Sequence, residues 1–235
     1  MYWPKKIVDL FPTVINSFRE KELAYLSLTS KPERPIQDRY ALLLNKKIDD
    51  KVFIKEYKRR DLVVFHDNGR LASKPNKEVD HVIEFKAGSA SSFSKKIQGE
   101  EYYSKANEFI GRVVKDIANR KREGSSYADT LNLGIKDLTG VFIGVEVLDE
   151  IPEKFTELFQ YSSRHNRHLS HEEKPDLEKR MIERFTEYTG EHSVKAFNTV
   201  LHRVEEVGSF ENIRVKIHLI AVQGNSNFPF QELAD

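Results

Sequence analysis

The sequence predicts an α/β protein in which helices flank a mixed central sheet. Apolar residues recur at helical spacing near the start, and they then alternate along three short runs. A second amphipathic stretch and a nearly continuous apolar run follow, which is typical of a strand buried on both faces. An additional C-terminal helical segment and a final strand complete the expected fold.

Length and composition favour a single domain. The chain has 235 residues, of which 39% are hydrophobic and 32% charged, and no linker rich in proline, glycine or serine divides it. We expect one domain over residues 1–235, with a core at about 30–150 and a helical elaboration at about 151–235.

The expected location is the cytoplasm, without a membrane segment. No apolar run is long enough to span a bilayer, and the start, MYWPKKIVDLF, carries no export signal. The chain has no cysteine, which excludes disulfides and thiolate metal sites and fits a reducing compartment.

The overall charge does not indicate nucleic-acid binding, because 38 basic residues face 37 acidic ones and the net charge is +1. Local basic clusters at 55–61, 119–123 and 162–168 carry that expectation, although each also fits a solvated surface. The residues that we expect to contact nucleic acid are Lys58, Arg59, Arg60, Lys95, Lys96, Arg164 and Arg167.

The first half of the chain predicts two helical stretches and then three strands. Apolar spacing indicates a helical stretch from Leu10 to Leu28 and a second helix that starts around Glu33. The period then changes to two, which predicts three consecutive antiparallel strands at 51–59, 61–69 and 79–88.

The second half begins with a long helix at about 95–121, which should pack Tyr103, Phe109, Ile110 and Val114 on the sheet. The run at 138–148 reads as a buried strand. After a His-rich loop, the sequence predicts helices near 175–189 and 193–206 and a last strand at 213–222.

The stretch HVIEFKAG, residues 81–88, carries two charges on one face of a strand that reads as buried. Side chains at i and i+2 share a face, so Glu84 and Lys86 project together, and buried charges need a partner or a metal. Antiparallel pairing with the preceding strand would put Asp61 opposite Lys86 and residue 63 opposite Glu84. Asp80 is a weaker candidate because it lies about 13 Å from Glu84 along the extended strand.

Two carboxylates beside a lysine form a hard oxygen site that suits Mg²⁺. Such a metal activates water and neutralises charge on a phosphoryl oxygen, and a nearby lysine orients the attacking water, so the pattern points to phosphodiester hydrolysis. The alternative is a common cross-strand salt bridge, of Asp61 with Lys86 or of Glu84 with Lys55 or Lys58.

The stretch from about 33 to 147 resembles the PD-(D/E)xK nuclease superfamily, which has the restriction-endonuclease-like fold. The metal-binding aspartate of that family matches Asp61 in RRDLVVF, and its E-x-K matches Glu84 and Lys86 in VIEFKAG. Arg60 stands where the proline of the family name would be. On the helix before the sheet, Glu33 matches an acidic residue that is usual in the family, and Gln37 follows one turn later. On the helix after the three strands, QGEEY matches the Q-x-x-x-Y of some members through Gln98 and Tyr102.

The resemblance implies a Mg²⁺-dependent DNA endonuclease, with Mn²⁺ as a substitute. Asp61 and Glu84 would bind the metal, Lys86 would place the water, and Glu33 would add a further carboxylate. Double-stranded DNA is the implied partner, a homodimer or larger assembly is compatible with it, and defence against foreign DNA is the implied setting.

Two other functions keep the same fold. One is an inactive nucleic-acid-binding or assembly module, which the near-neutral charge favours, and the other is an RNA-directed nuclease with the same site. His165, His168 and His171 invite a zinc site, but their spacing of three in a polar loop also fits a basic loop that contacts phosphates.

Overall fold

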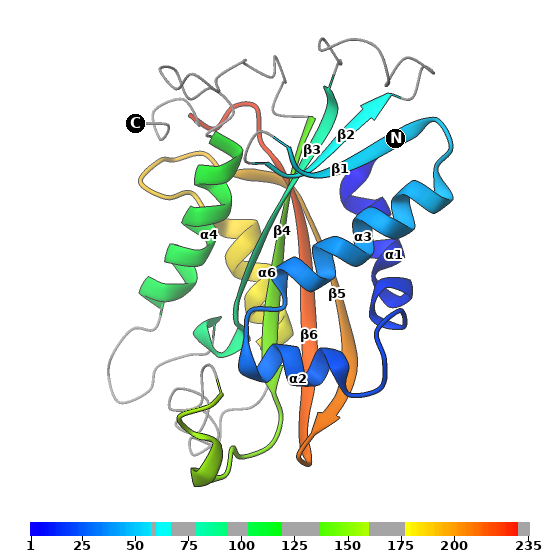
Figure 1. The fold of residues 1–235 in the computed structure, drawn as a ribbon. Coiled ribbons are helices and arrows are strands. Elements are labelled where there is room, and N and C mark those ends of the chain that lie inside the picture. Colours follow the sequence, from blue (N-terminus) through cyan, green and yellow to red (C-terminus); the bar gives the residue numbers. More distant parts are fainter. Residues whose placement is uncertain (58–59, 67–78, 94–102, 119–136, 160–176, 230–235) are drawn as a thin grey trace.

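A computed structural model of the protein describes residues 1–57, 60–66, 79–93, 103–118, 137–159 and 177–229. The chain forms an α/β structure with a six-stranded mixed sheet between two groups of helices (Figure 1). Helices α1, α2 and α3 lie on one side of the sheet, and α4 and α6 lie on the other. Within these described ranges, no helix is long and apolar enough to cross a membrane.

The N-terminal helices differ from the expected single stretch at 10–28. Their bounds are Trp3–Ile15 for α1, Glu22–Thr29 for α2 and Glu33–Lys47 for α3. The predicted stretch is broken before α2, where Lys21 has a φ of 66°, in the left-handed region. The predicted start at Glu33 is confirmed. Pro35 is compatible with it, because it lies in the first turn of α3, where a missing N–H costs no helical hydrogen bond.

The sheet has the strand order β1-β2-β3-β4-β6-β5. The first three strands form an antiparallel meander as predicted, β4 pairs parallel with β3, and β6 pairs antiparallel with β4 and with β5. The strand bounds are Lys51–Tyr57, Arg60–His66, Val79–Ser89 and Leu138–Val147 for β1 to β4, and Phe197–Phe210 and Ile213–Gly224 for β5 and β6.

The predicted register between β2 and β3 is wrong by two residues. Val63 lies opposite Val82, not opposite Glu84, and Leu62 lies opposite Ile83. A shift of two residues keeps every side chain on its face, so the apolar pattern could not distinguish the two registers. Side chains alternate between the two faces as strands require, because Leu62 and Ile83 pack under α1 and α3 while Val63 and Val82 pack under α4 and α6.

Helix α4, Tyr103–Ala118, connects the two parallel strands across one face of the sheet. Ile110 and Val114 are buried and Phe109 packs against the same core, while Arg112 is exposed, as the spacing predicted. Close packing here depends on Gly140 of β4, where an added Cβ would lie 2.5 Å from the Val113 side chain.

The predicted helix at 193–206 is wrong, because this segment forms β5. Val200, Leu201 and Val204 do recur at helical spacing, but the run is rich in β-branched residues and pairs along its length with β6. A two-residue turn joins the strands, with positive φ at Glu211 and Asn212, and this geometry matches the twist of a hairpin. The C-terminal elaboration therefore adds two strands to the sheet.

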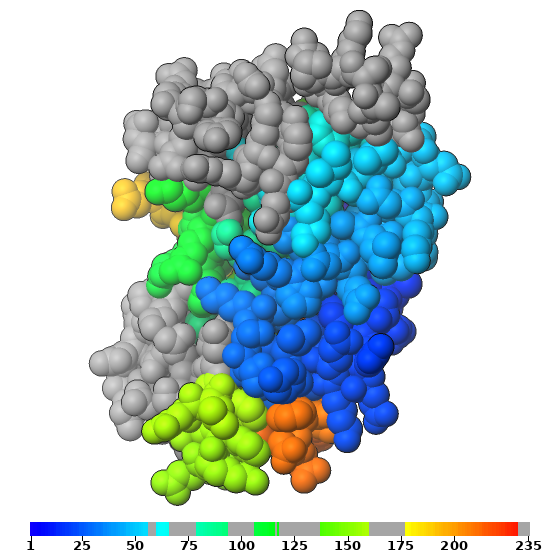
Figure 2. All heavy atoms as spheres, in the orientation of Figure 1, coloured from blue at the N-terminus to red at the C-terminus, as the bar shows by residue number. Residues whose placement is uncertain are grey.

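The predicted helix near 175–189 is observed as α6, Leu177–Glu187. The described residues also include the short 3-10 helices η1, Ala90–Phe93, and η4, Glu153–Phe155. The end of the β5–β6 hairpin lies beside the η4 segment (Figure 2), where Phe159 and Phe210 have ring centroids 6.3 Å apart.

Candidate active site

The candidate site lies where the backbone pairing of β2 with β3 ends, at Leu62 and Ile83. Beyond that point, two carboxylates accept hydrogen bonds from the backbone of β3. The Phe85 N–H donates to Asp61 Oδ2 at 2.7 Å, and the Ala87 N–H donates to Glu33 Oε2 at 2.8 Å. Side chains from β2 and α3 thus continue the hydrogen bonding of β3 where the neighbouring strand stops.

The two predicted metal ligands come from paired strands, as expected. Asp61 stands two residues from Val63, and Glu84 stands two residues from Val82. Both valines pack under α4 and α6, but the pairing of β2 with β3 ends before Asp61 and Glu84, where Asp61 accepts from the Phe85 N–H and Glu84 pairs with Arg60.

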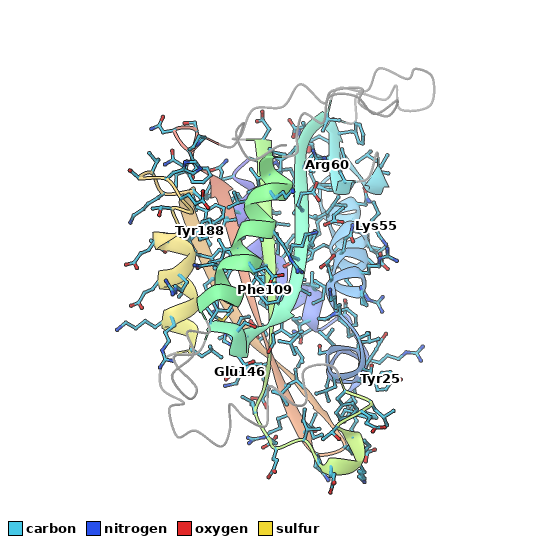
Figure 3. All side chains as sticks on the ribbon, turned by 90° about the vertical axis from the view of Figure 1, so that its left-hand side faces the viewer. Tyr25, Lys55, Arg60, Phe109, Glu146 and Tyr188 are labelled. Atoms are coloured by element: carbon cyan, nitrogen blue, oxygen red, sulfur yellow. The ribbon has the colours of Figure 1, made fainter. Side chains whose placement is uncertain are left out.

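Glu84 has a charged partner that the sequence did not predict. Its carboxylate forms an ion pair with Arg60, with 2.9 Å between Nη1 and Oε1, and the Glu84 side chain is only 7% exposed. A buried carboxylate needs such a partner, so Arg60 explains how the charge of Glu84 is tolerated. Figure 3 shows Arg60 beside β3, whereas Lys55, an alternative partner from the sequence, pairs with Asp38.

Glu33 interacts electrostatically with Asp61 and Lys86, although the three residues are far apart in sequence. Burial raises the pKa of Glu33 above 4.5, the positive charge of Lys86 and the Ala87 hydrogen bond oppose that rise, and the negative charge of Asp61 adds to it. The site therefore combines carboxylates from α3 and β2 with a lysine from β3.

Gln37 supports the same site from α3. Its side chain is buried, and its amide Nε2 donates to the backbone carbonyl oxygen of Asp61. Glu33 and Gln37 are one helical turn apart on α3. The helix therefore supplies both the carboxylate that accepts from the Ala87 N–H and the amide that donates to the Asp61 backbone.

The remaining predicted site residues lie outside the described residues. They are Gln98, Tyr102, Lys58, Arg59, Lys95, Lys96, Arg164 and Arg167, together with the histidines of the zinc alternative, His165, His168 and His171.

The donor types at the candidate site fit Mg²⁺, which takes few protein carboxylates and keeps several waters. Throughout the described ranges, no group of three or more histidine, aspartate or glutamate side chains is placed to hold a metal ion. Glu33, Asp61 and Glu84 are therefore not arranged as a three-carboxylate metal group, and Arg60 is the group that a cation would have to replace beside Glu84.

Sequence reasoning also missed a buried histidine at the start of β3. His81 is 3% exposed, hydrogen-bonds Thr139 at 2.8 Å and stacks on Trp3, and burial lowers its pKa to about 3. With Lys51 and Asp80 it lines a cavity of about 630 Å³. The signal in the sequence was a histidine inside an apolar run, which indicates burial but not a role.

The fold and site together define an α/β protein with a carboxylate–lysine cluster at a strand edge. Comparison with protein-family models, with curated proteins and with solved structures gave no match to this chain.

Proposed function

We propose that the chain is a divalent-metal-dependent nuclease of restriction-endonuclease-like fold, which hydrolyses phosphodiester bonds in DNA. The observation that carries the proposal is the grouping of Glu33, Asp61 and Lys86 around the β3 backbone, next to Glu84. The element order α3-β1-β2-β3-α4-β4, with β4 parallel to β3, supports it because the family resemblance implies this order.

In this proposal Asp61 and Glu84 hold Mg²⁺ or Mn²⁺. When bound there, the metal would supply positive charge for the phosphoryl oxygens and would lower the pKa of a coordinated water. Lys86, on the same strand face as Glu84, orients the attacking water. The water oxygen gives up one proton to solvent as it bonds to phosphorus, the bond from phosphorus to one ester oxygen breaks, and the leaving oxygen takes up one proton from solvent, which leaves a phosphate monoester end and a hydroxyl end.

Glu33 and Gln37 position the other groups. The Glu33 carboxylate holds the Ala87 N–H and lies within the electrostatic reach of Lys86, so it fixes the strand segment that carries the lysine. Gln37 holds the backbone of Asp61. Both contacts come from α3, which makes this helix the support of the proposed active site.

The test is a cleavage assay with plasmid DNA in Mg²⁺, in Mn²⁺ and in chelator. Wild-type protein should cut only with a metal, and Lys86→Ala should lower the rate by roughly a hundredfold or more, as expected when the attacking water is no longer positioned. Lys5→Ala removes an exposed lysine of α1 and is the matched control, which should cut at the wild-type rate. Unchanged cleavage by Lys86→Ala would refute the assigned role.

A second candidate function is a nucleic-acid-binding or assembly module without catalysis. The Arg60–Glu84 ion pair favours it, because Glu84 is already neutralised without a metal. Binding that persists in chelator, with no cleavage of matched DNA and RNA, would select this function. Cleavage of RNA alone would select an RNA-directed nuclease. Since the chain has no cysteine, we propose the cytoplasm as the location of either activity.

A further inference from the structure

Four titratable side chains form a continuous hydrogen-bonded chain that the proposed nuclease does not use. Glu178 Oε1 lies 3.1 Å from His202 Nδ1, His202 Nε2 lies 3.2 Å from His218 Nδ1, and His218 Nε2 lies 2.9 Å from Glu146 Oε2. These residues belong to α6, β5, β6 and β4, so the chain links the helix to three strands.

The centre of this chain is buried and its ends reach the surface. The side chains of His202 and His218 are 6% and 3% exposed, whereas those of Glu178 and Glu146 are 54% and 26% exposed. Figure 3 shows Glu146 on the face that α4 and α6 cover. Protons can therefore exchange through the two carboxylates while the imidazoles stay out of water.

The three contacts need more protons than two neutral imidazoles carry. An ionised carboxylate only accepts hydrogen bonds, and a neutral imidazole has a single N–H. The contact with Glu178 requires a proton on His202 Nδ1, the contact with Glu146 requires one on His218 Nε2, and the contact between the rings requires a third. Without that third proton, two lone pairs would face each other at 3.2 Å.

We propose that these four side chains form a proton-binding site, which holds the third proton and thereby ties α6 to the sheet. The third proton lies between His202 Nε2 and His218 Nδ1. Burial and then the neighbouring His218 lower the pKa of His202, against the effect of Glu178.

Among the described residues, the surrounding elements carry other charged groups of both signs, including Glu183 and Glu187 of α6. Lys216 of β6 lies opposite Glu146 of β4 and opposite Glu206 of β5, and Arg203 of β5 pairs with Glu205. The basic residues of α6 are Lys179, Arg180 and Arg184.

Stability should depend on pH in both directions. Below about pH 6.5 the two unfolded imidazoles bind two protons while the folded pair holds one, so stability falls as the pH falls. Above that pH the unfolded imidazoles are neutral while the folded pair keeps its proton, so stability falls as the pH rises until the site releases it. The contribution of this site is therefore greatest near the pKa of free imidazole.

The variant Glu178→Gln tests the proton count. The new side-chain amide can donate to His202 Nδ1, His202 can then donate to His218, and His218 to Glu146, so two neutral rings complete the chain. Urea unfolding between pH 7 and 9 should show the folding constant of wild-type protein falling by up to about tenfold per pH unit relative to Glu178→Gln. Glu183→Gln, an exposed change on the same helix, should follow wild type. Equal pH slopes for wild type and Glu178→Gln would overturn the proposal.

Nitrogen-15 NMR of the histidines in wild-type protein at pH 7 gives a second test that needs no variant to fold. The two rings should carry three protons on their four nitrogens, with His202 Nδ1 and His218 Nε2 both protonated. Two singly protonated rings would overturn the proposal.

Discussion

Replacing Asp61 with asparagine or alanine separates the hydrogen bond of Asp61 from its charge. In the structure its carboxylate accepts from the Phe85 N–H at 2.7 Å and raises the pKa of Glu33. Asparagine keeps an acceptor oxygen but has no charge. The weaker neutral hydrogen bond should cost about 1 kcal/mol, and relief of the repulsion on Glu33 offsets part of that loss. Asp61→Asn should therefore unfold within about 1 kcal/mol of wild type in chelator.

Alanine has no acceptor, so the Phe85 N–H loses its Asp61 partner. An unsatisfied backbone donor costs about 1–3 kcal/mol, and Asp61→Ala should be less stable than Asp61→Asn by that order. Both variants remove a proposed metal ligand. Wild-type protein should gain about 2.7 kcal/mol at a Mg²⁺ concentration of about 100 times its Kd, and both variants should lose most of that gain and all cleavage.

Urea unfolding at pH 7, with chelator and with millimolar Mg²⁺, measures all of these quantities on the same three proteins. The reasoning fails if Asp61→Asn is as unstable in chelator as Asp61→Ala, because the charge of Asp61 would then be a structural ion-pair partner. It also fails if Asp61→Asn keeps the stabilisation by Mg²⁺.

Three further variants test other parts of the structure. Because the folded pKa of Glu33 is raised, stability should fall as pH rises from about 4.5 through that pKa, and Glu33→Gln should lack this fall in unfolding experiments at pH 4 to 7. His81 has a folded pKa of about 3, so the stability of wild-type protein should fall as the pH drops below about 6.5, by up to about 1.4 kcal/mol per pH unit. His81→Gln should lack that contribution, and equal acid sensitivity of the variant and wild type would contradict the burial of His81. Gly140→Ala should cost about 1–3 kcal/mol, because the added Cβ meets Val113, and a melting temperature equal to that of wild type would contradict the close packing of α4 on β4.

Much of the central sheet could be predicted from the sequence because alternation and burial are local signals. The strands around Asp61 and Glu84 were found from the period of two, while a shared face for the two carboxylates stays a prediction. The register was not fixed, since a shift of two residues leaves the same apolar residues on each face. β5 was mistaken for a helix because Val200, Leu201 and Val204 recur at helical spacing, and only pairing with β6 reveals the strand.

Contacts between distant segments could not be predicted in the same way. Arg60 precedes Asp61 in a basic cluster that reads as a nucleic-acid contact, and its ion pair with Glu84 depends on how β2 meets β3. The hydrogen-bonded row Glu178–His202–His218–Glu146 forms only when α6 and the three strands β4, β5 and β6 are packed together. The sequence showed only two histidines in separate apolar runs.

The most direct test of the proposed active site is a crystal structure with Mn²⁺, located by its anomalous scattering. The account predicts a Mn²⁺ peak bonded to carboxylate oxygens of both Asp61 and Glu84, with the Arg60 guanidinium moved away from Glu84. An intact Arg60–Glu84 ion pair with no peak at Asp61, in crystals grown at a Mn²⁺ concentration that saturates any cleavage activity, would contradict it.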